Sequence, residues 1–245
     1  MRIAVVPDVQ ARDGLAYPHL AAYGEYIAAK RPDAIVHLGD HADMSSLSSY
    51  DKGKRSFEGR RYRKDIDAAR RAMDAFMEPI AKAKGYKPQM VLCLGNHEDR
   101  ISRAINDQPE LEGVIGVDDL RYAEYGWAVH PFLNVVMVGG VAFSHYFVSG
   151  SMGRAITTAA GLLTKRFQSC VAGHQQGYDS ARRYRADGRA IIGIITGSFY
   201  QHHEAYLGPQ GNAQHWRGAV FLNEVRNGSF DEMPLSLTYL LKRFK

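Results

Sequence analysis

The chain has 245 residues, of which 45% are hydrophobic, and this is enough to bury the core of a single domain. It contains no stretch of about 18 consecutive apolar residues, which excludes a membrane-spanning helix. The net charge of +5 and the pI of about 9.1 favour an anionic partner. The chain enters an apolar run at Ile3 without the pattern of a signal peptide, and Cys93 and Cys170 lie in apolar runs typical of packed thiols. We therefore expect a cytoplasmic protein.

The first half of the chain alternates strand-like and helix-like segments. Short apolar runs predict strands at residues 3–6, 34–38 and 90–94. Apolar residues at helical spacing predict helices between Pro18 and Pro32, over residues 62–84 and over residues 98–105. This alternation indicates an α/β fold that begins with a βαβ unit.

Short strands dominate the second half of the chain. They are expected at residues 127–129, 135–138, 141–144, 170–172 and 190–196, with one helix near 153–166. Residues 44–62 and 107–125 lack a clear period, and we interpret them as cap elements beside a cleft. The pattern predicts one domain, residues 1–245, with two stacked sheets flanked by helices.

Polar residues come directly after most of the predicted strands. They are Asp8-Val-Gln10, Gly39-Asp40-His-Ala-Asp43, Gly95-Asn96-His97-Glu98, His145 and Gly173-His174-Gln-Gln176. Ligand sites of open α/β sheets lie at such strand ends. Carboxylates, amides and imidazoles that converge there are the ligands of a divalent-metal hydrolase, so the sequence predicts a metal-phosphoester site.

The residue types suggest individual roles. A carboxylate such as Asp40 can bridge two cations about 4 Å apart, and Asn96 offers a neutral oxygen. His97 would face the substrate while Asp43 holds its ring, although Asp43 could equally be a helix cap. Glu98 is interpreted as a cap at a helix start. For Arg100, a surface position and a phosphate clamp remain open.

Histidines at strand ends are usually structural when they stand alone. His145 and His174 occupy equivalent strand ends in a chain with the other motifs, which favours metal ligands instead. His202, His203 and His215 are expected to lie on the surface or at a rim.

The basic residues are concentrated in two segments. Residues 51–71 hold nine of them, namely Lys52, Lys54, Arg55, Arg60, Arg61, Arg63, Lys64, Arg70 and Arg71. Four more lie close together at Arg182, Arg183, Arg185 and Arg189. Tyrosines and a phenylalanine lie among them, a mixture that could bind phosphates and stack bases, with Arg60 and Arg61 as candidate substrate-binding residues. The alternative is a solvated helix face.

The ordered motifs resemble those of the calcineurin-like metallophosphoesterase superfamily over residues 3–200. The resemblance implies a four-layer αββα sandwich of two mixed β-sheets flanked by helices, with two divalent metal ions. It implies that one metal is held by Asp8, Asp40 and the positions of Gln10 and Gln176. The other metal is implied to bind Asp40, Asn96, His145 and His174. His97, supported by Asp43, would protonate the leaving oxygen.

The chain departs from the family pattern at three places. Gln10 and Gln176 stand where the family usually has histidines, which predicts a harder and weaker first site. We expect Mn²⁺, with Mg²⁺, Ni²⁺, Zn²⁺ and Fe²⁺ as alternatives. Met44 follows Asp43 where protein phosphatases of the family carry arginine, so phosphoprotein substrates are disfavoured.

The sequence thus predicts a metal-dependent phosphoesterase acting on a phosphodiester of nucleic acid or of a nucleotide. The first alternative is a phosphomonoesterase acting on a small metabolite. The second is a catalytically silent phosphoesterase fold that binds nucleic acid through Arg60–Arg71.

Overall fold

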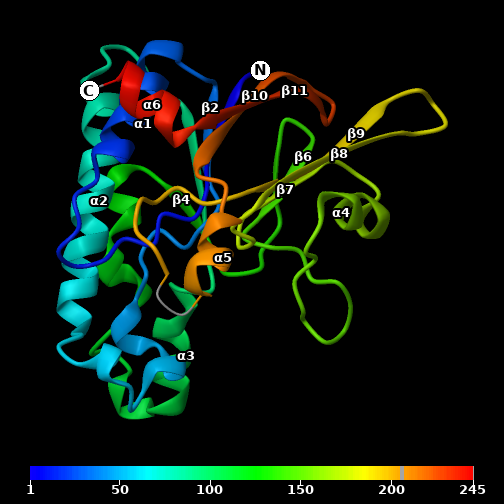
Figure 1. Cartoon of the computed structure of the whole chain (residues 1–245). Coiled ribbons are helices and arrows are strands. Elements are labelled where there is room, and N and C mark those ends of the chain that lie inside the picture. Colours follow the sequence, from blue (N-terminus) through cyan, green and yellow to red (C-terminus); the bar gives the residue numbers. More distant parts are fainter. Residues whose placement is uncertain (205–206, 245) are drawn as a thin grey trace.

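Two stacked β-sheets form the centre of the computed structural model, which describes residues 1–204 and 207–244 (Figure 1). The first sheet has the strand order β11 (Ser229–Ser236), β10 (Gly218–Arg226), β1 (Ile3–Val6), β2 (Ala34–His37), β3 (Gln89–Cys93) and β4 (Ala128–His130). The second has the order β5 (Val136–Val138), β6 (Val141–Ser144), β7 (Cys170–Ala172), β9 (Ala190–Thr196) and β8 (Tyr178–Tyr184). Strands β1 to β4 are parallel and reach one edge of the first sheet at β4, while β10 and β11 join antiparallel on the other side. In the second sheet β6, β7 and β9 are parallel, and β5 and β8 join antiparallel at the two edges.

Helices cover both outer faces of the pair of sheets (Figure 1). The first sheet carries α1 (Pro18–Lys30), α2 (Tyr62–Lys82) and α6 (Leu237–Arg243), and the second carries α4 (Ala159–Arg166). Two further helices, α3 (Asp99–Asp107) and α5 (Gly208–Ala213), lie nearer the strand ends. No helix within the described ranges has the length and apolar character that a membrane crossing requires.

The alternation of side chains along β1 explains the layers. Ala4 and Val6 pack with the helices in one hydrophobic cluster, while Ile3 and Val5 belong to a second cluster that fills the space between the sheets. Ala142 and Cys170 of the second sheet face outward and pack with Leu162 of α4. Because side chains alternate between the faces of a strand, the two sheets are buried on both sides. The predicted four-layer sandwich of two mixed sheets is confirmed.

Two segments differ from their predicted descriptions. The helix predicted near 153–166 begins at Ala159, because the Thr158 side chain accepts a hydrogen bond from the Gly161 backbone at 3.1 Å and caps it. Residues 107–125 contain three short 3-10 helices, at Pro109–Leu111, Val117–Leu120 and Tyr122–Tyr125. Leu120 and Tyr122 of this segment are buried in the helical layer.

Candidate active site

The polar motifs gather where strands of the two sheets end. Asp8 follows β1, Asp40 follows β2, Asn96 follows β3, His145 follows β6 and His174 follows β7. The strands within each group are parallel, so their carboxyl ends lie at one edge of the molecule. The sequence motifs, up to 168 residues apart, therefore meet in space.

Two glycines allow the backbone to approach the carboxylates. A Cβ atom on Gly95 would lie 2.1 Å from Asp40 Oδ1, and one on Gly173 would lie 2.5 Å from Asp8 Oδ1. Asp40 itself has a φ of 48° and His174 a φ of 66°, both in the left-handed region that residues other than glycine rarely adopt. Such strain at a cluster of polar side chains is typical of a functional site.

Two histidine side chains converge on the oxygen of Asn96. Asn96 Oδ1 lies 2.8 Å from His145 Nε2 and 2.8 Å from His174 Nδ1, and His145 Nε2 is also 3.4 Å from Asp40 Oδ2. His145 Nδ1 lies 2.8 Å from the carbonyl oxygen of Leu38 and must donate its proton there. In the neutral imidazole, Nε2 then presents a lone pair to the Asn96 and Asp40 oxygens. Converging lone pairs of this kind fit a cation, and Asp40, His145 and His174 form a candidate metal site.

A second group surrounds Asp8, which is fully buried. Gln176 Nε2 donates to Asp8 Oδ2 at 2.8 Å, and the His174 backbone donates to Asp8 Oδ1 at 3.1 Å. This leaves Gln176 Oε1 buried without a hydrogen-bond partner among the described residues. Burial, together with the nearby Asp40, raises the pKa of Asp8 to about 7. An orphaned oxygen beside a carboxyl group that resists ionisation also fits a cation.

Gln10 is buried but does not appear in these contacts. Its backbone has a φ of 47°, and the residue borders a cavity on the side of Tyr17 and Tyr200. The structure therefore brings together Asp8, Asp40, Asn96, His145, His174 and Gln176, while Gln10 lies against the neighbouring cavity.

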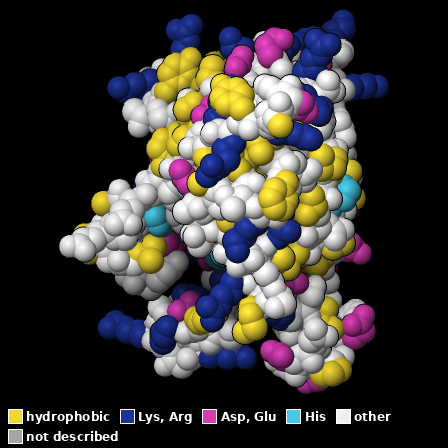
Figure 2. Space-filling view, turned by 90° about the vertical axis from the view of Figure 1, so that its right-hand side faces the viewer, with side chains coloured by type: hydrophobic (Ala, Val, Ile, Leu, Met, Phe, Trp, Pro, Cys, Tyr) yellow, Lys and Arg dark blue, Asp and Glu magenta, His cyan; other side chains and the backbone are white. Residues whose placement is uncertain are grey.

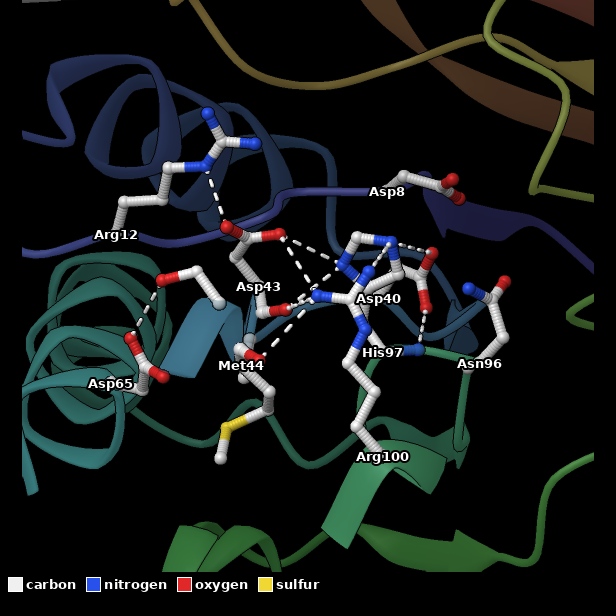
Figure 3. A network of polar contacts seen from close by, with 12 residues as sticks. Asp8, Arg12, Asp40, Asp43, Met44, Asp65, Asn96, His97 and Arg100 are labelled. Atoms are coloured by element: carbon white, nitrogen blue, oxygen red, sulfur yellow. Dashed lines mark hydrogen bonds and ion pairs between the residues drawn. The ribbon is translucent and has the colours of Figure 1, made fainter. Parts of the chain in front are cut away.

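His97 forms a dyad with Asp43 (Figure 3). His97 Nδ1 lies 2.9 Å from Asp43 Oδ1, so Nδ1 carries a proton and Nε2 is the atom free to exchange one. Nε2 lies 3.7 Å from Asp40 Oδ2. Burial alone would lower the pKa of His97, but Asp40 and Asp43 outweigh it and the pKa is raised. This arrangement can supply a proton beside the candidate metal site.

Two arginines hold the dyad in place. Arg12 Nε donates to Asp43 Oδ2 at 2.7 Å, and its terminal nitrogen pairs with Glu204. Arg100 Nη1 donates to the Asp43 carbonyl at 2.7 Å, and Nη2 lies 3.2 Å from His97 Nε2 (Figure 3). The sequence left a surface position open for Arg100, but the residue is half-buried at the site. Arg12 and Glu204 were missed, because nothing local in the sequence marks them as partners of Asp43.

Glu98 corrects the prediction of a helix cap. It forms no side-chain cap on α3. Its buried carboxylate instead accepts backbone hydrogen bonds from Gly95, Asp40 and Ala42 at 2.8–2.9 Å. The Tyr122 hydroxyl donates a further bond at 3.2 Å. One carboxylate thus joins the loops that follow β2 and β3.

The basic residues are less concentrated in space than in sequence. Arg60 donates to Asp51 Oδ2 at 2.7 Å and to the Ser45 carbonyl at 3.1 Å, while Arg61 is exposed. Arg182 and Arg183 are exposed on β8. Figure 2 shows Lys and Arg side chains at both the upper and the lower end of one face, with Asp and Glu among them. This face carries no single continuous basic patch.

One comparison with known proteins identifies the family of the chain. The calcineurin-like phosphoesterase family matches over residues 1–186, and the chain belongs to this family. Its members use divalent metal ions, and the chain is a metal-dependent phosphoesterase, a hydrolase of phosphoric ester bonds. A solved crystal structure is similar over 96% of this chain and 99% of its own, with 12% identity and a TM-score of 0.45. No curated protein sequence matches the chain.

Proposed function

We propose that the enzyme hydrolyses a phosphodiester of nucleic acid or of a nucleotide. The observation that carries this proposal is the state of the two arginines at the site. Arg12 is neutralised by Asp43 and Glu204, and Arg100 is held by the Asp43 carbonyl. Arg12 is therefore not left to balance the second negative charge of a monoester, and Arg100 has one donor committed to the dyad, whereas a diester carries only one charge.

We infer the following ligand set from the geometry. Asp40, Asn96, His145 and His174 would hold one divalent ion, and Asp8, Asp40 and Gln176 would hold the other. Mn²⁺ is the proposed metal, because amide and carboxylate oxygens prefer it to softer ions. Bound ions of this kind activate water and neutralise charge on the phosphate. Gln10 is not part of the set.

The protein side chains would supply the remaining chemistry. His97 Nε2 would donate a proton to the leaving oxygen, which then departs from a nucleotide diester as an alcohol instead of a basic alkoxide. Asp43 Oδ1 accepts a hydrogen bond from His97 Nδ1 at 2.9 Å. This bond orients the ring so that Nε2 points away from Asp43. Arg100 Nη2 lies 3.2 Å from Nε2 and can donate a hydrogen bond to that nitrogen once its proton has passed to the leaving oxygen.

A nucleic-acid substrate would also use the exposed start of α2. Arg61 and Arg63 are exposed there, and Arg63 pairs with Asp67 at 3.3 Å on the same helix. Changing both to Gln is expected to raise KM for oligonucleotides. It should also flatten the salt dependence of binding by roughly 0.7–0.9 in slope for each lost phosphate contact. A matched control changes the exposed Lys84 and Lys87 to Gln, beyond the far end of α2 and about 30 Å away.

The direct test compares bis-p-nitrophenyl phosphate with p-nitrophenyl phosphate in Mn²⁺, Mg²⁺ and Ni²⁺. Faster turnover of the diester is expected, with Mn²⁺ the most effective ion. Preference for the monoester would replace the proposal by a phosphomonoesterase. Absence of turnover with every ion, in a protein that binds oligonucleotides, would indicate a silent nucleic-acid-binding fold.

A further inference from the structure

A cavity of about 310 Å³ lies directly beside the site. Val9 and Gln10, which follow Asp8 in the chain, form one wall, and the segment around Tyr200 forms another. The two walls are tied together where the Phe199 backbone donates to the Asp8 carbonyl at 2.7 Å. The lining residue Val9 therefore directly follows a residue that is a proposed metal ligand, Asp8. Its volume is at the lower limit for small-molecule sites, which suits one ring system.

The lining is rich in aromatic rings and amides. The rings of Tyr17, His19, Tyr200 and His202 line it together with the amides of Gln10 and Gln201. None of the lining residues carries a carboxylate, an ammonium or a guanidinium group. Burial lowers the pKa of His19 to about 4, so its ring is neutral at physiological pH. Such a lining rejects a second phosphate and accepts a neutral, flat, hydrogen-bonding ring.

One polar group in the wall, the His19 ring, is held by weak contacts, among them one to the Phe199 backbone. His19 is 2% exposed, its Nδ1 lies 3.2 Å from Gln201 Oε1, and its buried Nε2 forms no hydrogen bond of ordinary geometry within the described residues. An unpaired buried nitrogen costs free energy unless a ligand satisfies it. A ring with its own donors and acceptors could do so.

The walls are held by hydrogen bonds of their own. Tyr17 donates to the Arg12 carbonyl at 2.8 Å, and Arg217 donates to the carbonyls of Gln201 and His202 at 3.1 and 2.9 Å. The rings of Tyr200 and His202 stack at 4.3 Å between centroids. A cavity formed before the ligand arrives binds without first ordering its walls.

We propose that this cavity is a base subsite, which holds the nucleobase of a nucleotide phosphodiester while the phosphate lies at the metal ligands. The proposal rests on the proposed function and narrows the substrate to diesters that carry a base next to the scissile phosphate. The base would lie against the aromatic rings and hydrogen-bond to His19 and to the amides.

Kinetics with two diesters that share a leaving group test the subsite. Thymidine 5′-p-nitrophenyl phosphate carries a base, and methyl p-nitrophenyl phosphate does not. KM for the thymidine ester is expected to be about tenfold lower, the size of one base stack. In Leu15→Trp, which fills the cavity, the ratio of the two KM values should approach one. In His19→Phe, which keeps a ring without the nitrogens, the preference for the thymidine ester should fall but not vanish. Val114→Trp, at a position 69% exposed in another segment, is the control and should keep the wild-type ratio.

Binding of free nucleosides to the chelator-treated protein separates the subsite from catalysis. Chemical-shift changes with thymidine, adenosine, guanosine, cytidine or uridine, lost in Leu15→Trp, are expected. Equal KM values in the wild type together with no nucleoside binding at millimolar concentration would overturn the subsite and leave diester hydrolysis standing. Nucleoside binding without turnover of either diester would support the subsite and contradict the proposed function.

Discussion

Asn96 Oδ1 lies 2.8 Å from Nε2 of His145, and the other ring nitrogen of His145 donates a hydrogen bond to the Leu38 carbonyl. This contact directs an imidazole lone pair and an amide oxygen to one point, next to Asp40. The Asp8 group offers an amide in place of imidazoles, and an amide is the weaker ligand for borderline metals.

We therefore predict that the two metal ions differ in affinity. Mild chelation should remove the ion near Asp8 and Gln176 first and leave the ion near His145 and His174. Anomalous scattering from crystals of the partly chelated protein, together with metal content, measures this order. An ion retained near Asp8 after loss of the other would contradict the ligand assignment.

Glu98→Gln is predicted to lower both stability and metal affinity. The carboxylate now accepts hydrogen bonds from three backbone N–H groups. In glutamine, an NH₂ group replaces one of the two oxygens and would face at least one of these donors. That buried donor would then have no acceptor. The free energy of unfolding should fall by about 2–4 kcal/mol in a denaturant titration. Tyr122→Phe removes a single donor and is the control, with an expected loss of about 1 kcal/mol. Equal losses in the two variants would show that Glu98 does not organise the loops.

His97→Ala is predicted to lower turnover by about two to four powers of ten, because the ring protonates the leaving group. Metal content should remain that of the wild type. The loss should shrink along a series of aryl diesters as the leaving group becomes less basic. A loss that is independent of the leaving group would leave His97 with an electrostatic role alone.

Stability below neutral pH should depend on His19. Its folded-state pKa of about 4 lies below the unfolded value of 6.5, so the unfolded chain binds the extra proton. This contribution to stability is complete above pH 6.5 and is lost as pH falls toward 4. Between pH 7.5 and 5, the free energy of unfolding of the wild type should fall by about 2 kcal/mol more than that of His19→Gln. Denaturant titrations of both proteins with chelator present test this, and a constant difference across the range would exclude a buried neutral His19.

The sequence was most informative where function requires a fixed local pattern. Strand ends followed by Asp40, Asn96 or His174 are visible in the sequence because the apolar run and its polar successor are adjacent. The layered fold could be predicted for the same reason, because α2 and the parallel strands have clear local patterns of apolar residues. Gly24 in α1 is different: a Cβ atom there would lie 2.4 Å from the Phe76 carbonyl, a constraint that only the packed helices reveal.

Contacts between distant segments could not be predicted in this way. Glu98 was interpreted as a cap because it begins a helix, yet its partners include Asp40 and Ala42 of another loop. Arg12 meets Asp43 and Glu204 only through the folded arrangement of three segments. The cavity beside Gln10 likewise needs residues 199–202 to be placed against the first loop.

Restoration of activity to chelator-treated protein tests the central claim most directly. Turnover of methyl p-nitrophenyl phosphate is measured as Mn²⁺ is added back to the wild type and to Asp40→Asn, whose fold is checked by circular dichroism. We predict no turnover before addition, recovery in the wild type, and turnover near background in the variant at every Mn²⁺ concentration. Turnover by the metal-free wild type, or full recovery in Asp40→Asn, would contradict diester hydrolysis at this metal site.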